Sequence, residues 1–289
     1  MNPTVCPPPG GFIFKKLPFV LMFLCFCAIL LFMTILHSIL FGIVEGISEF
    51  LPISSTGHLI LFSHILALAQ TDFLKSFEIA IQLGAIASVV VLYWRSFLLN
   101  VAVMKRIVVA FIPTGIVGLV LYKIIKTYLL GNETIVVWAL ILGGIFLIVF
   151  ELLHKERDDA AANVEDISYK QAFGIGLAQS VAIIPGVSRS AATILGGLGM
   201  RIKRATIVEF SFLLAAPIML VATAYDLYKT PAVFVGSNFT TLIVGFVVSF
   251  FVAYGSIRFL LRFIKTHTFI PFGVYRIVIG LLFLLLIVL

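Results

Sequence analysis

The feature that most constrains this chain is a series of apolar, nearly uncharged stretches that recur along its length. A helix needs about 20 such residues to cross the hydrocarbon core of a bilayer. Hydrophobic residues account for 62% of the chain and charged residues for 11%, against about 45–50% and about 25% in soluble domains. A soluble fold has too little interior to bury so many apolar side chains. The sequence therefore predicts an integral, multi-pass membrane protein.

The apolar stretches are predicted to be helices. Backbone exposed to lipid must satisfy its hydrogen bonds within the spanning structure, and these stretches lack the alternation of barrel strands. Charged and turn residues place the spans at about 17–40, 74–95, 106–126, 134–153, 205–228, 238–264 and 270–289. A shorter apolar segment at 170–184 and two polar regions, at 41–58 and 185–193, interrupt this series.

The net charge of +7 comes from few charged residues. We interpret it as a bias of the loops toward an anionic membrane face, so nucleic-acid binding is not expected. Two basic clusters indicate cytoplasmic helix ends: Arg201, Lys203 and Arg204, and then Arg258, Arg262 and Lys265. All three cysteines lie within the first 27 residues, which leaves the rest of the chain without a disulfide framework or a cysteine-ligated metal.

The chain is predicted to hold an N-terminal extension, residues 1–32, and a single membrane-embedded domain, residues 33–289. The extension combines prolines, Lys15-Lys16 and an apolar run in the manner of a signal peptide. Its uncharged run is, however, as long as a spanning helix, so its role stays open. The polar loop HKERDDAAANVED divides the domain into two halves, about 33–153 and 167–289.

The two halves share a weak internal repeat. GIVEGISEFLPISST, from Gly42, aligns with GLAQSVAIIPGVSRS, from Gly176, and the alignment pairs Glu45 with Gln179 and Ser54 with Ser188. In both copies proline, glycine and hydroxyl residues interrupt an apolar piece. That pattern is typical of broken or re-entrant helices that line a cavity inside the membrane. The sequence therefore predicts a duplicated unit.

Two carboxylates stand in the first of these segments. Glu45 and Glu49 are four residues apart, which places both on one face of a helix. A charged group inside a membrane segment costs at least ~2.5 kcal/mol, so it indicates a functional site. Two adjacent carboxylates repel each other unless a cation or a shared proton lies between them, and oxygen ligands suit Mg2+ or Ca2+. The alternative is a pair of interfacial carboxylates bonded to nearby backbone.

The segment LPISSTGH follows directly, and we expect Pro52 and Gly57 to break the helix there. It supplies three hydroxyls and an imidazole: Ser54, Ser55, Thr56 and His58. Successive backbone amides in such a turn can bind an anion, particularly where a helix begins. The imidazole is a candidate nucleophile toward phosphorus or a general base for a seryl hydroxyl or water. A hydrogen-bonded packing histidine is the alternative.

The second polar segment, IPGVSRSAAT, carries Arg189 between Ser188 and Ser190, with Gly186 before it and Thr193 after it. The guanidinium fork matches two phosphoryl oxygens and stays charged at any accessible pH. Arg189 is therefore a candidate phosphate clamp. The alternative is an arginine that neutralises Glu45 or Glu49, and one site could combine both roles. Three further polar residues in apolar segments are weaker candidates: Glu78, Gln82 and Glu209.

These motifs resemble those of a known family. EGISEFLPISSTGH from Glu45, together with PGVSRSAAT from Pro185, is similar to the paired signature of the undecaprenyl-diphosphate phosphatases, also called bacitracin-resistance proteins. The resemblance covers about residues 33–289 and includes AIQLGAI after Glu78 and EFSFLLAAP from Glu209. It implies an all-α polytopic helical bundle with two inverted repeats and re-entrant helices, around a cavity open to the outer, periplasmic side of the bacterial plasma (inner) membrane.

The resemblance also implies a reaction: hydrolysis of undecaprenyl diphosphate to undecaprenyl phosphate and inorganic phosphate. This recycles the lipid carrier for cell-wall synthesis and confers bacitracin resistance. By the family's pattern, Glu45 and Glu49 support a divalent metal, Mg2+ or Ca2+. The catalytic residues would be Glu49, Ser55, His58 and Arg189. The substrate-binding residues would be Ser54, Thr56, Gly186, Ser188, Ser190 and Thr193.

Two other classes compete with this interpretation. In the acid-phosphatase-like lipid phosphatases, a Ser-Arg pair is followed by five residues and then a histidine. This chain has Leu195 at that place, so that class is not expected. A carrier or flippase would also use broken helices and Arg189, but it would not require His58 as a chemical group. The sequence leaves open the nucleophile (Ser55, His58 or water), the metal, the preferred prenyl length, lipid flipping and the formation of a homodimer.

Overall fold

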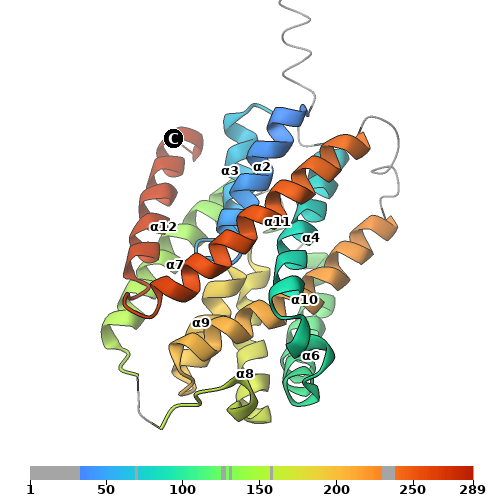
Figure 1. Ribbon diagram of the computed structural model, residues 1–289. Coiled ribbons are helices and arrows are strands. Elements are labelled where there is room, and N and C mark those ends of the chain that lie inside the picture. Colours follow the sequence, from blue (N-terminus) through green and yellow to red (C-terminus); the bar gives the residue numbers. More distant parts are fainter. Residues whose placement is uncertain are drawn as a thin grey trace, which may run out of the picture.

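A computed structural model describes residues 33–68, 71–124, 128–129, 132–156, 159–229 and 238–288. Within these ranges the chain is helical apart from loops and one isolated bridge between Ala161 and Ile202 (Figure 1). The extension at 1–32, with most of the first predicted span, lies outside the described residues. The predicted all-α class is confirmed.

The long helices follow the predicted spans closely. They are α4 (Asp72–Leu92), α6 (Val101–Ile124), α7 (Glu133–Leu153), α10 (Arg204–Lys229), α11 (Asn238–Phe263) and α12 (Ile270–Phe283), which η5 (Leu284–Val288) continues. In the described part of the chain, four segments are long and apolar enough to cross a membrane: Val101–Leu121, Glu133–Leu153, Arg204–Tyr225 and Phe239–Phe263. The short elements α5 (Trp94–Leu98) and η2 (Val164–Asp166) lie in connections. The chain is a multi-pass membrane protein.

Two helix boundaries differ from the prediction, the start of α6 and the end of α2. Helix α6 begins at Val101 rather than near 106, because Arg106 is accommodated inside it by donating to the Ile167 carbonyl and lying over the Tyr169 ring. Helix α2 (Ile35–Ser48) runs into the region predicted as a polar motif. It does so because its glycines are packing positions rather than breaks. A Cβ on Gly46 would lie 2.7 Å from the Val252 Cβ of α11.

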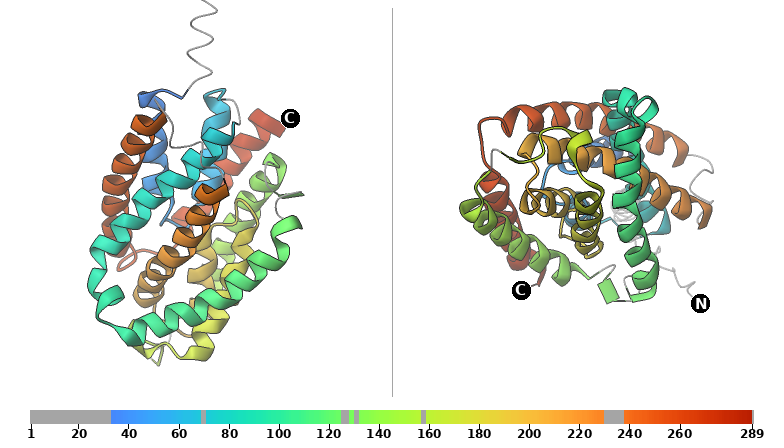
Figure 2. Two further views of the ribbon diagram at one scale, coloured as in Figure 1. Left: turned by 90° about the vertical axis from the view of Figure 1, so that its right-hand side faces the viewer. Right: turned by 90° about the horizontal axis from the view of Figure 1, so that it is seen from below.

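Two short helical hairpins enter the molecule from opposite ends (Figure 1). One pairs α2 with α3 (Ser55–Ile65), and the other pairs α8 (Tyr169–Gln179) with α9 (Arg189–Gly199) through η3 (Ser180–Ile183). At about 1.5 Å per residue these helices are about 17–21 Å long, less than the ~30 Å hydrocarbon core. Each hairpin therefore turns back inside the protein. Figure 2 shows the α8–α9 hairpin surrounded by the longer helices.

The packing partners of the two halves correspond. Helix α2 packs on α11 of the second half, and α8 packs on α6 of the first. Likewise α4 contacts α10, and α7 contacts α12. This exchange is what an inverted repeat predicts, and the repeat itself stays an inference.

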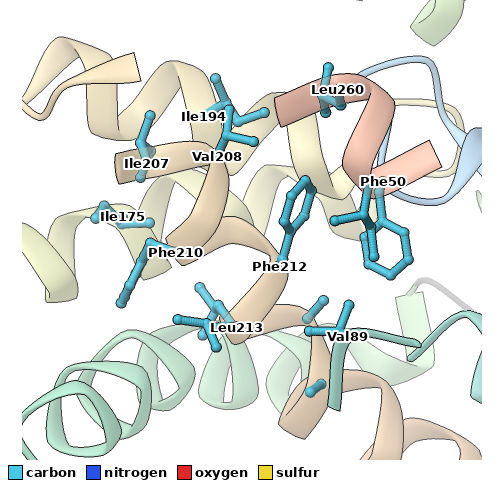
Figure 3. Close-up of a cluster of buried hydrophobic side chains, with 14 of the residues drawn as sticks. Phe50, Val89, Ile175, Ile194, Ile207, Val208, Phe210, Phe212, Leu213 and Leu260 are labelled. Atoms are coloured by element: carbon cyan, nitrogen blue, oxygen red, sulfur yellow. The ribbon is translucent and has the colours of Figure 1, made fainter. Parts of the chain in front are cut away.

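The largest apolar core lies around the central helix α10. Figure 3 shows Phe210, Phe212 and Leu213 of this helix among side chains from several elements. Phe50, from the turn of the first hairpin, packs edge-on against Phe212 with ring centroids 5.3 Å apart. The core thus holds the turn of the α2–α3 hairpin against a rigid, buried helix.

Several basic residues stand in segments at the end of the molecule that carries α8 and α9, where α4 ends and α6 and α10 begin (Figure 1): Arg95, Lys105, Arg106, Lys170, Arg201, Lys203 and Arg204. Lys75 at the start of α4, and Lys123 and Lys229 at the ends of α6 and α10, stand at the other end. Arg204, predicted as a surface anchor, is instead mostly buried there. It forms an ion pair of 2.6 Å with Glu151 and lies over the Phe269 ring. Its role is to join α7, α10 and the start of α12.

Candidate active site

The turns of both hairpins share one strained backbone conformation. Ser54 has φ 75° and caps the start of α3, where its Oγ accepts from the Gly57 N–H. Ser188 has φ 74° and caps α9 in the same way, through the Ala191 N–H. A non-glycine residue held in such a conformation costs about 1–3 kcal/mol and is typical of functional sites. The predicted break at Gly57 is wrong, since this glycine lies within the first turn of α3.

The two turns are in direct contact near the middle of the bundle. The Ser190 hydroxyl donates to the Leu51 carbonyl over 2.9 Å and lies 3.1 Å from the Ser188 hydroxyl. Helices α3 and α9 both start here and run toward opposite ends of the molecule (Figure 1). The positive ends of both helix dipoles therefore meet at one place, which is the arrangement that binds phosphate.

Glu49 connects the first residues of these two helices. Its Oε2 accepts the Ser55 hydroxyl over 2.5 Å, and its Oε1 lies 3.1 Å from the Arg189 Nη2. The Glu49 side chain is 4% exposed and that of Arg189 is 14% exposed. A buried carboxylate in contact with a seryl hydroxyl can take its proton, and this is the usual relation of a nucleophile and its base.

One nitrogen of the Arg189 guanidinium has no acceptor among the described residues. The Nη1 of Arg189 donates to the Ser211 carbonyl of α10 over 3.0 Å, and its Nη2 faces Glu49. Its Nε is buried and has no acceptor among the described residues. A buried N–H without a partner is costly. The geometry thus combines the two sequence interpretations of Arg189, because it neutralises Glu49 and still offers a hydrogen bond to an anion.

Glu45 lies one turn before Glu49 on the same face of α2, as predicted. It is fully buried, and neither of its carboxylate oxygens has a hydrogen-bond donor in the described part of the chain. The charged groups that act on it are Glu49, Glu78 and Arg189. Such a carboxylate calls for a cation or a proton beside it.

The carboxylate pair fits a loosely held divalent ion. No group of three or more His, Cys, Asp or Glu side chains able to hold a metal occurs among the described residues. Glu45 and Glu49 would provide two ligands, and water and phosphate oxygens would complete the shell. Mg2+ is usually bound in that manner, by one or two carboxylates plus substrate phosphates.

His58 bonds to Ser54 and Tyr275, and no contact between His58 and Ser55 occurs among the described residues. Its Nδ1 lies 2.8 Å from the Ser54 carbonyl, so this nitrogen carries the proton. Its Nε2 is then left to accept from the Tyr275 hydroxyl, 2.9 Å away. The two rings are stacked, with centroids 5.5 Å apart and planes 3° from parallel. The contacts of the described residues join Ser55 to Glu49, not to His58.

The remaining predicted residues lie in the second turn or on the helices that start at the two turns. Gly186 and Ser188 belong to the second turn itself, where Gly186 has φ +91° and a Cβ would lie 2.7 Å from the Val136 carbonyl oxygen. Thr193 is buried one turn into α9, with its hydroxyl within hydrogen-bond distance of the Gln179 Oε1 and the Arg189 carbonyl. Thr56 is exposed at the start of α3. Contact of these residues with substrate stays a prediction.

Two residues of α12 complete the site and were not predicted. Tyr275 holds His58, and Arg276 is fully buried between the two turns, where it donates to Pro52 and Val187 carbonyls. An arginine inside the apolar stretch 269–289 is itself a signal of function, by the same rule that identified Glu45. Of the weaker candidates, Glu78 lies near Glu45. Glu209 instead borders a polar pocket with Glu165, beside the connection of α7 to α8.

Known proteins match almost the whole described chain. The sequence pattern of the bacitracin resistance protein BacA matches residues 38–282. An undecaprenyl-diphosphatase of Sulfurihydrogenibium sp. (strain YO3AOP1) is 53% identical over 253 residues, which cover 88% of this chain and 99% of that protein. The undecaprenyl-diphosphatase of Aquifex aeolicus is 52% identical over 251 residues, or 87% and 98%. That of Wolinella succinogenes is 49% identical over 252 residues, again 87% and 98%.

The paired motifs, the two crossed hairpins that bring them together and these similarities agree. The chain belongs to the bacitracin resistance protein (BacA) family.

Proposed function

We propose that the protein hydrolyses undecaprenyl diphosphate to undecaprenyl phosphate and inorganic phosphate in the bacterial plasma membrane. The observation that carries this proposal is the contact of Ser55, Glu49 and Arg189 where the N-termini of α3 and α9 meet. This place combines a nucleophile, a proton acceptor and a fixed positive charge. Recycling of the lipid carrier, and with it bacitracin resistance, follows from the reaction.

The chemistry follows from the contacts. The Ser55 Oγ attacks the terminal phosphorus while its proton passes to the Glu49 Oε2, 2.5 Å away. The bond from that phosphorus to the bridging oxygen breaks, and the lipid monophosphate leaves. Glu49 releases its proton to solvent and then accepts a proton from the water that attacks the phosphoserine. The bond between phosphorus and the Ser55 Oγ breaks, Oγ takes the proton back from Glu49, and the water oxygen leaves in inorganic phosphate. The Arg189 Nε–H and the helix N-termini offset the charge that develops on the phosphoryl oxygens.

A divalent ion held by Glu45 and Glu49, Mg2+ or Ca2+, would add positive charge against the diphosphate. His58, with Nδ1 fixed by Ser54 and Nε2 facing Tyr275, lies on the α3 side of the turn and is only partly buried. It would orient phosphate or water at the mouth of the site by exchanging Tyr275 for that ligand at Nε2. Thr56, exposed at the start of α3, would contact substrate from the same side.

The site is proposed to open to the outer, periplasmic side. More of the described basic residues stand at the α8–α9 end of the bundle than at the other end, and basic residues favour the cytoplasmic side. His58 and Thr56 lie on α3, which runs from the centre toward the other end (Figure 1). The prenyl tail needs no specific binding pocket, because the surrounding lipid and the apolar outer faces of the helices can accommodate it. Association of two copies stays a prediction, which the mass of the protein in detergent tests.

The test is phosphate release from a polyprenyl diphosphate by purified protein in detergent. Wild type is assayed with magnesium, with calcium and with a chelator, beside Ser55→Ala, His58→Ala and Arg189→Ala. Ser256→Ala is the matched control, because the bond of this hydroxyl within the described ranges is to the Val252 carbonyl of its own helix, α11. Chelator-sensitive release that Ser55→Ala and Arg189→Ala abolish supports the proposal. Folded wild type that releases no phosphate with any metal or prenyl length refutes it.

The Ser55 assignment has its own test. Terminally labelled substrate, quenched in acid during turnover, should leave label on wild type and none on Ser55→Ala. Label that persists on Ser55→Ala would move the attack to another group. A pure transporter would move lipid without releasing phosphate and would tolerate His58→Ala.

A further inference from the structure

Arg276 has an environment unlike that of any other charged residue in the described part of the chain. It is 0% exposed, and its guanidinium donates to backbone carbonyls alone. The acceptors come from three separate segments: Pro52 of the first turn, Gly186 and Val187 of the second turn, and Ala139 and Leu140 of α7. Their distances run from 3.0 to 3.4 Å.

The carbonyls need such a donor. Each hairpin unwinds at its turn, so the carbonyls of Pro52, Gly186 and Val187 have no N–H of a following helical turn to accept from. In the interior of a membrane protein, irregular backbone is tolerated only where the protein itself supplies partners. The five N–H groups of one planar guanidinium supply them at fixed relative positions.

The charge of Arg276 has no carboxylate partner among the described residues. A buried charge is expensive, and apolar residues of similar volume are often as stable or more so. The carbonyls explain why a donor is needed here, but they do not by themselves explain why that donor carries a full charge. Its hydrogen bonds to Pro52 of the first turn and to Gly186 and Val187 of the second relate it to the site.

The neighbouring helix leaves room for this guanidinium. Gly143 of α7 has no side chain, and a Cβ there would overlap the Arg276 Nη2 and lie 2.9 Å from its Cζ. Gly144 likewise lets α12 approach, with the Gly273 carbonyl 2.7 Å from its Cβ position. The glycine pair thus lets the guanidinium reach both turns.

We propose that Arg276 is a positioning residue for phosphate transfer. By tying Pro52 to Gly186 and Val187, it fixes the distance between the two strained serine caps and so the alignment of Ser55, Glu49 and Arg189. The inference rests on the phosphatase activity proposed above. Misplacing reacting groups by about 1 Å costs about 10²-fold in rate.

Arg276→Lys tests the inference, because it keeps the charge and loses the planar fork. We expect kcat per folded molecule to fall about 10–100-fold, with KM changed less than threefold. The matched control is Arg204→Lys, at another mostly buried arginine, which pairs with Glu151 away from the turns. It should lower the melting temperature and leave kcat unchanged. Wild-type kcat in Arg276→Lys, or equal losses of kcat in both variants, overturns the inference.

Gly143→Ala tests the same point without removing the arginine. The added methyl displaces the guanidinium, so kcat should fall at least fivefold in the wild-type background and little further in Arg276→Lys. Gly255→Ala is the control, since a Cβ there meets nothing within 4 Å. If Arg276→Lys does not fold, Gly143→Ala with wild-type kcat still overturns the inference. Wild type without phosphate release would instead refute the proposed function.

Discussion

Replacing Glu49 by glutamine should separate the structural and chemical roles of the Ser55–Glu49–Arg189 contact. Glutamine has nearly the same shape as glutamate, but one end of its amide is a donor. Glu49 accepts from two groups at once, the Ser55 hydroxyl and the Arg189 guanidinium. In Glu49→Gln, one of these donors must therefore face the amide NH₂, whichever way the amide is turned.

The expected sizes follow from burial. Removing one partner of a buried ion pair typically costs about 3–5 kcal/mol, and both side chains of this pair are mostly buried. At about 2–4 °C per kcal/mol for chains of 150–250 residues, a loss of about 3 kcal/mol lowers the melting temperature by about 6–12 °C. Loss of a general base lowers the rate by about 10²–10⁴-fold.

A double substitution distinguishes the two losses. In Glu49→Gln with Arg189→Met, the buried charge has gone together with its partner, so much of the stability should return. The activity should not return, because the proton acceptor and the phosphate donor are both missing. Unfolding is followed in detergent by the fluorescence of Trp94 and Trp138, and activity by phosphate release.

Either of two results would refute this reasoning. A Glu49→Gln protein that releases phosphate within threefold of the wild-type rate would show that Glu49 does not accept the Ser55 proton. Melting shifts of Glu49→Gln and Arg189→Met that simply add in the double variant would show that the two side chains do not pair.

Three other substitutions have clear expectations. Tyr275→Phe removes the donor to His58 while keeping the stacked ring. We expect kcat to fall about 2–13-fold, by the range of a lost hydrogen bond, with little change in melting temperature; an unchanged pH–rate profile would contradict a role through the imidazole. Gly186→Ala adds a Cβ at positive φ and 2.7 Å from the Val136 carbonyl oxygen, so it should lower the melting temperature by several degrees, and an unchanged melting curve would contradict the backbone described. Glu45→Gln removes a buried carboxylate that has no hydrogen-bond partner in the described part of the chain, so it should raise stability while activity falls and no longer responds to magnesium; a magnesium response like that of wild type would exclude Glu45 as a ligand.

The fold was largely predictable because a membrane allows few alternatives. Apolar runs bounded by charge located α7, α10, α11 and α12 to within a few residues. The start of α6 was placed too late because a charge was taken as a boundary, although Arg106 finds a carbonyl acceptor and an aromatic face inside the helix. Charge limits a span only when no partner is available, and partners come from tertiary structure.

The site residues that could be predicted are those whose charge makes burial in a membrane segment costly in free energy. Glu45, Glu49 and Arg189 are charges in apolar segments, and the structure gathers all three. The direction of His58 was not predictable, because its neighbours in sequence are hydroxyls and its partner Tyr275 lies 217 residues away. Arg276 carried the same signal as Glu45, but Tyr275 beside it is of a type common in apolar segments and no second charged residue stands nearby to mark a motif. Its acceptors are carbonyls, which the sequence does not reveal.

The position of Arg276 on α12 bears on how the protein matures in the membrane. Both motifs precede this helix in the chain, and α12 packs against α7 of the first half. An insertion intermediate can therefore hold both hairpins in the bilayer while the guanidinium of Arg276 is still outside the bundle. Its turns would lack their shared donor, and its serine caps would not be aligned. Catalytic competence is thereby coupled to completion of the bundle, so phosphate release should report assembled protein and not merely inserted protein.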